Sequence, residues 1–247
     1  MVNIIDIYNS YLLDISVKEN KRRQKNQDKF SASSAGYCFR KQWYKVNGYE
    51  QIDMDERSLR LLRLGTIVHR DLEKAVNRFV EFPMLYKQYS PSSKAYTEHK
   101  VTIPELNVVG HLDVAVIDGD EVQIYDLKTA HSFKWKKVFG RNVDPNPSVN
   151  YQLQLGTYGL GMLEKLKDEE KDYHVKLNLI WYKKDDSMMK VQPIADTWID
   201  DAFEYWAELN EEVEVNGEPP EIGTHNVPIY NWECKYCPYH KIHCKGI

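Results

Sequence analysis

The chain has 247 residues, 42% of them hydrophobic and 28% charged, which is enough apolar material for one large domain or two small ones. Its formal net charge of −4 excludes a protein that is basic overall, so any contact with nucleic acid must come from local patches. No stretch approaches the ~18 apolar residues of a membrane span, and the N-terminal "MVNIIDIYNSYLLD" lacks a signal pattern, so we expect a cytoplasmic protein.

The first third of the chain predicts two helices. Before them, residues 18–29, "KENKRRQKNQDK", hold six Lys or Arg against two acids, which is typical of a solvated helix or loop; a DNA-facing patch is the alternative. Ser31 to Ser34 offer an N-cap for a short helix through residues 35–46. Residues 56–82 read as a long amphipathic helix with an apolar stripe formed by Leu59, Leu62, Val68, Leu72, Ala75, Val76 and Phe79.

Residues 110–130, "GHLDVAVIDGDEVQIYDLKTA", predict a β-hairpin that carries charges in its apolar rows. Strand alternation places Asp126 and Lys128 on one face. Asp113 shares that face if the loop has an even number of residues. Two carboxylates this close repel each other unless a cation or a proton lies between them. The alternative is an exposed edge hairpin with a solvated charged face.

The length of the hairpin loop sets how the two carboxylates pair. A two-residue loop at Asp118-Gly119 makes Asp113 and Asp126 diagonal neighbours, about 7–8 Å apart between Cα atoms. A four-residue loop from Asp118 to Glu121 makes them direct partners. Both loops keep the carboxylates on the same face.

The second half of the chain alternates helix and strand. We expect a helix over 148–166 that starts near Ser148, a strand over 175–184, and a helix over 196–217 that is capped near Thr197. The order of helix, antiparallel strands, helix, strand and helix indicates a mixed sheet flanked by helices.

Residues 131–142, "HSFKWKKVFGRN", follow the hairpin and interleave basic with aromatic side chains. This composition suits a single nucleic-acid strand, whose phosphates are neutralised while its bases stack. The expected DNA contacts are Lys134, Trp135, Lys136, Lys137 and Arg141, with Phe133 and Phe139 between them. The alternative is a solvated loop whose aromatic residues pack inward.

Two pairs of residues lie one helical turn apart. His69 and Glu73 share a face of the first long helix, and either side chain could reach a metal, although a lone histidine on an apolar helix edge is more often structural. Gln154 and Tyr158 share a face of the 148–166 helix, which could orient Lys128 or simply pack on the sheet.

Three of the four cysteines crowd the C-terminal "WECKYCPYHKIHCKG". Cys234, Cys237 and Cys244 have C-x2-C-x6-C spacing, which suits ligation of zinc or an iron–sulfur cluster. Cys38 could supply a fourth thiolate. A zinc site of three cysteines and either His240 or His243 competes with it, because both histidines fall in the same loop.

The order of these motifs resembles that of a known enzyme family. His69, then Asp113 in "GHLD", then Asp126 and Lys128 in "YDLKT", then Gln154-x-x-x-Tyr158 resembles the RecB family of PD-(D/E)XK nucleases. The cysteine plan is similar to that of the iron–sulfur members, which include the CRISPR-associated RecB-like exonucleases and the nuclease domain of AddB. The chain departs from the commonest pattern in two ways: no proline precedes Asp113, and Asp126 stands where many relatives have glutamate.

The resemblance implies roles for the site residues. His69, Asp113, Asp126 and the Leu127 carbonyl would bind Mg2+ or Mn2+, and Lys128 would position the attacking water. Gln154 and Tyr158 would orient Lys128 or the DNA backbone. A structural 4Fe–4S cluster would be held by Cys38, Cys234, Cys237 and Cys244.

The resemblance also implies an α/β, restriction-endonuclease-like fold in a single nuclease domain over residues 1–247. Its catalytic core would span about 56–195, and the iron–sulfur clasp would join Cys38 to 234–244. We expect a DNA exonuclease acting on single strands or ends, beside recombination, replication or CRISPR-adaptation proteins. The alternatives are a structure-specific or spacer-processing endonuclease, and a non-catalytic zinc- or cluster-stabilised DNA-binding module.

Overall fold

The computed structural model describes residues 3–24, 28–81, 93–141, 148–222 and 232–247. The chain divides into two compact units, which are described separately. The first unit comprises residues 1–30, 37–68 and 212–247, and the second comprises 31–36 and 69–211. Among the described residues, no helix is both long and apolar enough to cross a membrane.

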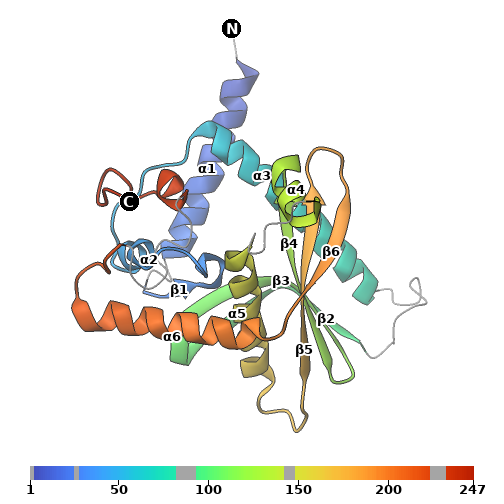
Figure 1. The fold of residues 1–247 in the computed structure, drawn as a ribbon. Coiled ribbons are helices and arrows are strands. Elements are labelled where there is room, and N and C mark those ends of the chain that lie inside the picture. Colours follow the sequence, from blue (N-terminus) through green and yellow to red (C-terminus); the bar gives the residue numbers. More distant parts are fainter. Residues whose placement is uncertain (1–2, 25–27, 82–92, 142–147, 223–231) are drawn as a thin grey trace. The chain divides into compact units, whose positions relative to one another are not determined.

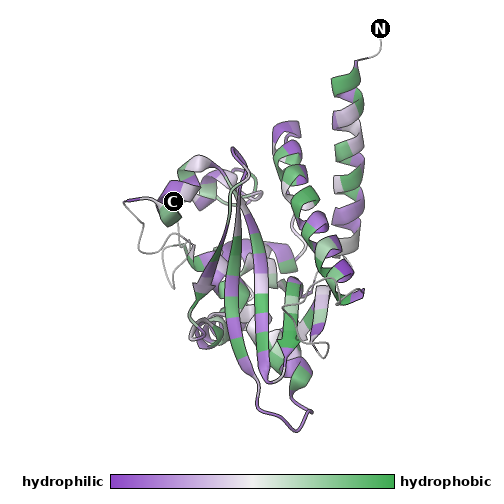
Figure 2. Ribbon diagram, turned by 90° about the vertical axis from the view of Figure 1, so that its right-hand side faces the viewer, coloured by the Kyte–Doolittle hydropathy of each residue, from purple (hydrophilic) through white to green (hydrophobic). Residues whose placement is uncertain are grey.

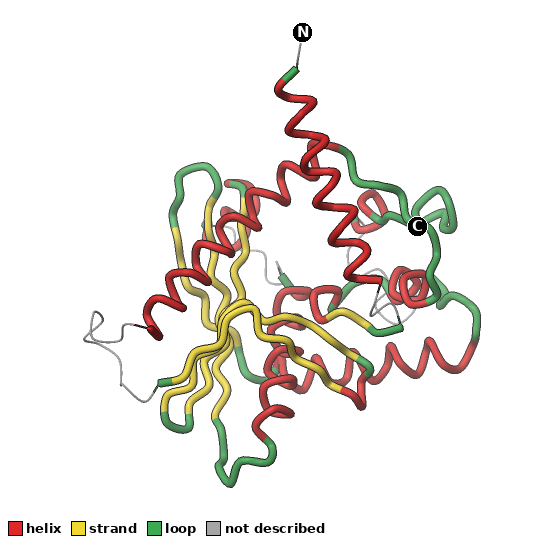
Figure 3. The backbone as a smooth tube through the Cα atoms, turned by 180° about the vertical axis from the view of Figure 1, so that it is seen from behind, coloured by secondary structure: helices red, strands yellow, loops and turns green. Residues whose placement is uncertain are grey.

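One mixed, six-stranded sheet contains the predicted hairpin (Figures 1 and 3). Its hydrogen-bonded order is β1-β3-β4-β5-β6, and β2 also pairs with β3. The β2–β3, β3–β4 and β5–β6 pairs are antiparallel, and β4–β5 is parallel. This confirms the predicted mixed sheet. The strands are β1 (Phe30–Ser31), β2 (Lys94–Ile103), β3 (Val108–Asp118), β4 (Glu121–Ala130), β5 (His174–Lys183) and β6 (Met189–Ile194).

The register of the hairpin brings the two carboxylates opposite each other. Val114 pairs with Tyr125, so the next pair along the same register would be Asp113 and Asp126. Asp118 itself pairs with Glu121. The turn is therefore residues 119–120, and the predicted two-residue loop one position earlier is wrong. Gly119 adopts φ +64°, a conformation that favours glycine and so fixes the turn there.

The hairpin is internal, so its prediction as an exposed edge is wrong. Strand β4 lies between β3 and β5, and apolar and polar residues alternate along the strands (Figure 2). A parallel neighbour requires a long crossover, which here contains α4 (Ser132–Phe139) and α5 (Val149–Leu166). Helix α5 matches the helix predicted over 148–166, and it packs on β2, β4 and β5.

Three glycines of α5 let it approach its neighbours closely. A Cβ at Gly156 would collide with the Trp198 carbonyl of α6 (Trp198–Asn216), and one at Gly159 would lie 2.9 Å from Ile199. A Cβ at Gly161 would lie 2.6 Å from Val101 of β2. The sequence "LGTYGLGML" thus packs α5 against both a helix and a strand. Helix α6 confirms the helix predicted over 196–217.

The N-terminal helices agree only partly with the sequence. Helix α3 (Glu56–Glu81) matches its prediction, but only Leu59 of the expected stripe is buried, and Leu62 and Ala75 are exposed. The short helix predicted over 35–46 begins later, as α2 (Phe39–Val46). Gly36 has φ +71°, which is not a helical conformation, so the helix cannot include it.

Helix α1 (Ile4–Gln24) was not predicted, and neither were β2 and β6. Apolar residues are distributed around α1 rather than along one face (Figure 2). A helix without a one-sided stripe has no periodic signal. Residues 25–27, which belong to the basic stretch at 18–29, lie outside the described residues.

The first unit has its own small aromatic core. Trp43 and Tyr44 of α2 pack with Tyr239 from the C-terminal segment, and the side chains of Cys237 and Cys244 lie against them. The C-terminal cysteines are therefore held beside α2, which follows Cys38 directly.

Candidate active site

The two hairpin carboxylates are buried in the second unit. Asp113 on β3 is 8% exposed, and Asp126 on β4 is 1% exposed. The Leu127 amide donates a hydrogen bond of 2.7 Å to Asp113 Oδ2. Gln154 Nε2 donates to Asp126 Oδ1 at 3.3 Å. A buried charge needs partners, so these contacts belong to a built site and not to a solvated face.

Lys128 lies between Asp126 and Gln154. Its Nζ is 2.7 Å from Asp126 Oδ2 and donates a hydrogen bond of 2.8 Å to Gln154 Oε1. The approach to Asp126 Oδ2 is close enough for an ion pair but lies outside hydrogen-bond angles, so this buried oxygen accepts no hydrogen bond within the described part of the chain.

The charges of Asp113, Asp126 and Lys128 shift the pKa values of Asp126 and Lys128. Burial raises the pKa of Asp126 to about 6; the Lys128 ammonium opposes this shift and the Asp113 carboxylate adds to it. Burial alone would lower the pKa of Lys128, but the attraction of Asp126, followed by that of Tyr151 and Asp113, leaves that pKa raised. Lys128 therefore stays protonated and acts as a fixed positive charge, not as a base.

Helix α5 contributes the amide and the phenol expected from their spacing. Gln154 Nε2 also donates to the Tyr158 hydroxyl at 2.8 Å, so one amide contacts Tyr158, Asp126 and Lys128. Burial, followed by the negative charges of Asp126 and Asp113, raises the pKa of Tyr158 well above its usual value. Tyr158 is thus a neutral hydroxyl that fixes the amide of Gln154.

His69 reaches the site from α3. Its Nδ1 lies 3.2 Å from Asp113 Oδ2. Burial would lower the pKa of His69, but its hydrogen bond with Asp113 and the charges of Asp113 and Asp126 leave that pKa raised. His69 therefore joins the carboxylate cluster as expected, and a role as a metal ligand remains a prediction.

The structure adds Glu98, which the sequence did not indicate. Thr97 pairs with Val114 and His99 with Leu112, so Glu98 interrupts β2 at the level of Asp113. It has φ +45°, which is strained for glutamate. Burial, the Glu73 and Asp113 charges and a hydrogen bond with Glu73 raise the pKa of Glu98 to about 7. No pattern in the polar "KAYTEHKV" could have singled it out, because its position depends on pairing with a distant strand.

The donor set fits a hard divalent cation. Within the described residues, Asp126 Oδ2 is a buried acceptor without a hydrogen bond. The carboxylate oxygens of Asp113 and Asp126 are the ligand type that Mg2+ prefers, and the His69 imidazole makes Mn2+ a good fit. In the described residues, no three His, Cys, Asp or Glu side chains are already grouped closely enough to enclose an ion. Their present partners explain this, because Asp126 faces Lys128, and Asp113 faces His69 and the Leu127 amide.

The four cysteines line one pocket in the first unit. They are free thiols, and Lys41, Glu233 and His240 line the pocket with them. Burial raises the pKa of the Cys38 thiol to about 12, so its thiolate needs a compensating cation. The Gly246 amide donates to Cys244 Sγ at 3.4 Å, and a Cβ on Gly246 would lie 3.5 Å from Cys234 Sγ. These features fit a group bound by thiolates.

The two tail histidines differ in position. His240 lines the cysteine pocket, and its Nδ1 lies 2.8 Å from the Cys234 carbonyl oxygen. His243 instead places Nε2 3.1 Å from the Glu50 carbonyl oxygen. Of the two zinc ligands considered from the sequence, His240 is therefore the one that the structure places at the cysteines.

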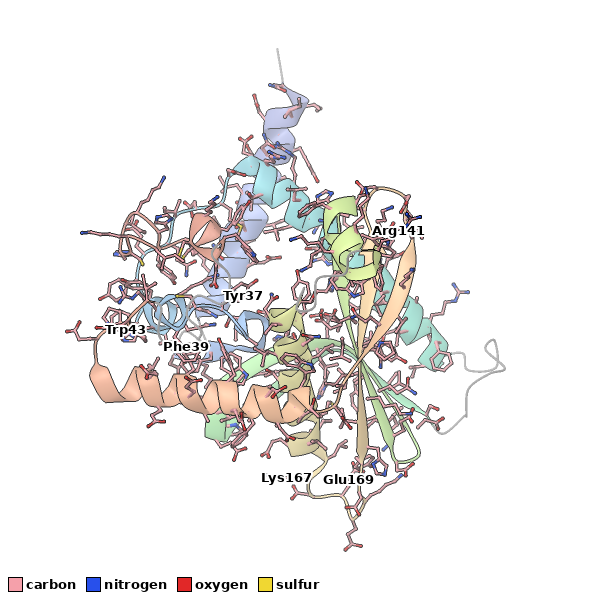
Figure 4. All side chains as sticks on the ribbon, in the orientation of Figure 1. Tyr37, Phe39, Trp43, Arg141, Lys167 and Glu169 are labelled. Carbon is pink, nitrogen blue, oxygen red and sulfur yellow. The ribbon has the colours of Figure 1, made fainter. Side chains whose placement is uncertain are left out.

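The basic segment after β4 is a helix, α4, and not a loop. Lys136, Lys137 and Arg141 are exposed, and Arg141 follows the end of α4 (Figure 4). Trp135 is 7% exposed and packs on Phe139 at 4.8 Å between ring centroids. The prediction that Trp135 contacts DNA is therefore wrong, because its indole belongs to the core.

The fold and the sequence both have known relatives. The crystal structure of SSO0001 matches 98% of each chain with a TM-score of 0.56 at 17% sequence identity, which indicates the same fold. An alkaline exonuclease from Laribacter hongkongensis (TM-score 0.45, 11% identity) and a candidate exonuclease from Eubacterium rectale (0.49, 15%) each match 77% of this chain, and 90% and 81% of their own. No curated protein matches the sequence. The sequence profile of the PD-(D/E)XK nuclease superfamily matches residues 24–244, and the chain belongs to that superfamily.

Proposed function

We propose that the protein is a metal-dependent DNA exonuclease that hydrolyses phosphodiester bonds. The observation that carries this proposal is the buried set of Asp113, Asp126 and Lys128, joined by Gln154. A module that only binds DNA gains nothing from paired buried carboxylates, because they repel phosphates.

Each residue has a distinct task in the proposed reaction. Asp113, Asp126, the Leu127 carbonyl and His69 would hold Mg2+ or Mn2+, which lowers the pKa of a water and offsets charge on the scissile phosphate. Lys128 orients the attacking water and stabilises negative charge that develops on the phosphate oxygens. Gln154, which Tyr158 fixes, holds the Lys128 ammonium in place.

The cysteine pocket supports a structural 4Fe–4S cluster bound by Cys38, Cys234, Cys237 and Cys244. The presence of all four cysteines in the lining of one pocket and the amide that Gly246 directs at Cys244 Sγ favour this cluster. Zinc bound by three cysteines and His240 is the second candidate, because a hydrogen bond from His240 Nδ1 to a carbonyl leaves Nε2 available as a ligand.

The substrate is proposed to be single-stranded DNA or DNA ends, contacted by Lys134, Lys136, Lys137 and Arg141. All four follow the strand that carries Lys128. Proteins of recombination, replication or CRISPR adaptation are the proposed partners, because the motif and cysteine plan resembles that of nucleases in those systems.

The test is cleavage of end-labelled single- and double-stranded DNA with Mn2+, Mg2+ or EDTA. We expect cleavage from an end that requires the metal and is abolished by Asp113→Ala, Asp126→Ala and Lys128→Ala while DNA binding persists. Full activity in a purified carboxylate variant would refute the site. Cleavage of a closed circular strand would identify an endonuclease, and metal-independent binding without cleavage would identify a binding module.

A further inference from the structure

The aromatic residues of α4 differ sharply in exposure. Trp135 is buried against Phe139, which in turn lies 6.1 Å from Trp181 of β5 between ring centroids. Phe133 is 74% exposed. The core therefore explains Trp135 and Phe139 but does not explain a phenyl ring held in water at Phe133.

The surroundings of Phe133 are positively charged. The Lys137 ammonium lies 5.0 Å from the centroid of the Phe133 ring. Lys136 is exposed on the same short helix, and Lys134 follows Phe133 directly. An exposed ring among cations matches a strand that offers both a flat base and a phosphate.

Lys134, which follows Phe133 in the sequence, has its ammonium group near that of Lys128. The Tyr151 ring of α5 has the Lys128 ammonium 4.6 Å from its centroid and the Lys134 ammonium 5.5 Å from it. Because these two distances sum to 10.1 Å, the two ammonium groups cannot be farther apart than that. A strand whose phosphate reaches Lys128 can therefore also contact the Lys134 ammonium of α4, the helix that carries Phe133.

We propose that Phe133 stacks on an unpaired base of the DNA strand being cut, a few nucleotides from the scissile bond, while the α4 lysines neutralise the flanking phosphates. The inference rests on the proposed nuclease function and narrows its substrate to DNA that is single-stranded beside the site. Duplex bases are already stacked on one another and cannot cover the ring.

The test measures binding of the full-length protein to a fluorescein-labelled oligothymidylate by anisotropy in EDTA, where no cleavage occurs. Phe133→Ala should weaken binding roughly 5- to 150-fold, the range for loss of one base–aromatic stack. In the wild type, an abasic nucleotide at one position of the oligonucleotide should cause the same loss. In Phe133→Ala that abasic nucleotide should cause no further loss, since the partner ring is already gone.

Two further variants complete the design. Phe133→Trp should restore binding, because indole stacks at least as well as phenyl. Phe203→Ala removes a ring of α6 that is 42% exposed and should bind like the wild type. Equal affinity of Phe133→Ala and wild type, or abasic losses that persist in Phe133→Ala at every position, would overturn the stacking role.

The outcomes separate this inference from the function on which it rests. A wild-type protein that cleaves single strands while Phe133→Ala binds normally refutes only the stacking role. A wild-type protein that neither binds nor cleaves DNA refutes the proposed function itself, and the charged face of α4 would then fit an acidic protein partner.

Discussion

At the scale of single residues, Gln154 positions the side chains of Lys128, Asp126 and Tyr158 relative to one another. Its amide accepts from Lys128 and donates to both Asp126 and Tyr158, so it ties a cation, an anion and a neutral hydroxyl together. An amide is the only side chain of this size that can both donate and accept in these directions.

Gln154→Leu should therefore lower the cleavage rate about 10- to 100-fold, as loss of a supporting residue around a metal site does. The metal requirement should persist, because the carboxylates remain. Single-turnover rates in Mn2+ measure this effect. Tyr158→Phe, which loses only the outer hydroxyl, should fall between Gln154→Leu and wild type; an unchanged rate in Gln154→Leu would show that Lys128 needs no support.

Asp126 should give the protein an unusual dependence of stability on pH. Its folded-state pKa of about 6 exceeds the ~3.9 of an unfolded aspartate. The folded state thus keeps the proton longer, and the free energy of unfolding should fall by up to about 3 kcal/mol as pH rises from about 4 to about 6.

Urea unfolding in EDTA between pH 4 and pH 7 checks this slope. The Asp126→Asn variant should lack this slope. Its free energy of unfolding should differ from that of the wild type by an amount that does not depend on pH, because Lys128 loses its partner but stays protonated between pH 4 and pH 7. Parallel stability curves for the two proteins would contradict the raised pKa.

Strand alternation predicted that Asp126 and Lys128 share one face, because side chains alternate strictly along a strand. Asp113 was predicted on that face only for a hairpin loop with an even number of residues, which the register gives. Alternation did not predict Glu98. That residue comes level with Asp113 through a pairing between strands and a φ of +45°, neither of which leaves a trace in the local sequence.

Helix α5 shows at the scale of elements how a sequence encodes close packing. Its glycines meet α6 and β2 where any side chain would collide. The 3.6-residue period predicted α3, and start and stop signals predicted α5 and α6. The period did not predict α1, which has no single apolar face. The sequence also did not indicate β6, an edge strand that contains Pro193 and has a mostly exposed surface.

Gly156→Ala should destabilise the protein by about 1–3 kcal/mol, because the added methyl collides with the rigid Trp198 carbonyl. Intrinsic helix propensity alone would favour alanine, so the sign of the effect separates packing from propensity. Urea titration with Leu163→Ala on the same helix as the control measures it. A more stable Gly156→Ala protein would mean that α6 moves away from α5 far enough to accommodate the methyl group.

A metal or cluster bound in the cysteine pocket would act at the scale of the whole molecule, because it would join Cys38 to Cys234, 196 positions later. Closing a loop of this length removes chain entropy worth on the order of 5 kcal/mol in the simple polymer model. The spacing predicted that these cysteines meet. It could not choose the metal, because thiolates bind both iron and zinc.

Protein purified without oxygen should be brown and contain about four irons per chain, as a cluster held by four thiolates implies. Cys38→Ala should lose the colour and stability, while His240→Ala and His243→Ala should keep both. Metal analysis and thermal unfolding measure the outcome. Colourless protein with one zinc, lost in His240→Ala but kept in His243→Ala, would instead establish the zinc site.

The parallel pairing of β4 with β5 has a consequence for folding order. The β3–β4 hairpin joins neighbours in sequence and can form within microseconds. Asp126, however, pairs with Leu179 across the crossover of residues 131–173, and Gln154 lies inside that crossover. Contacts this distant in sequence form slowly. We therefore expect the carboxylates to meet early and Lys128 to be held beside Gln154 only after α5 docks, so that the proposed site is completed late in folding.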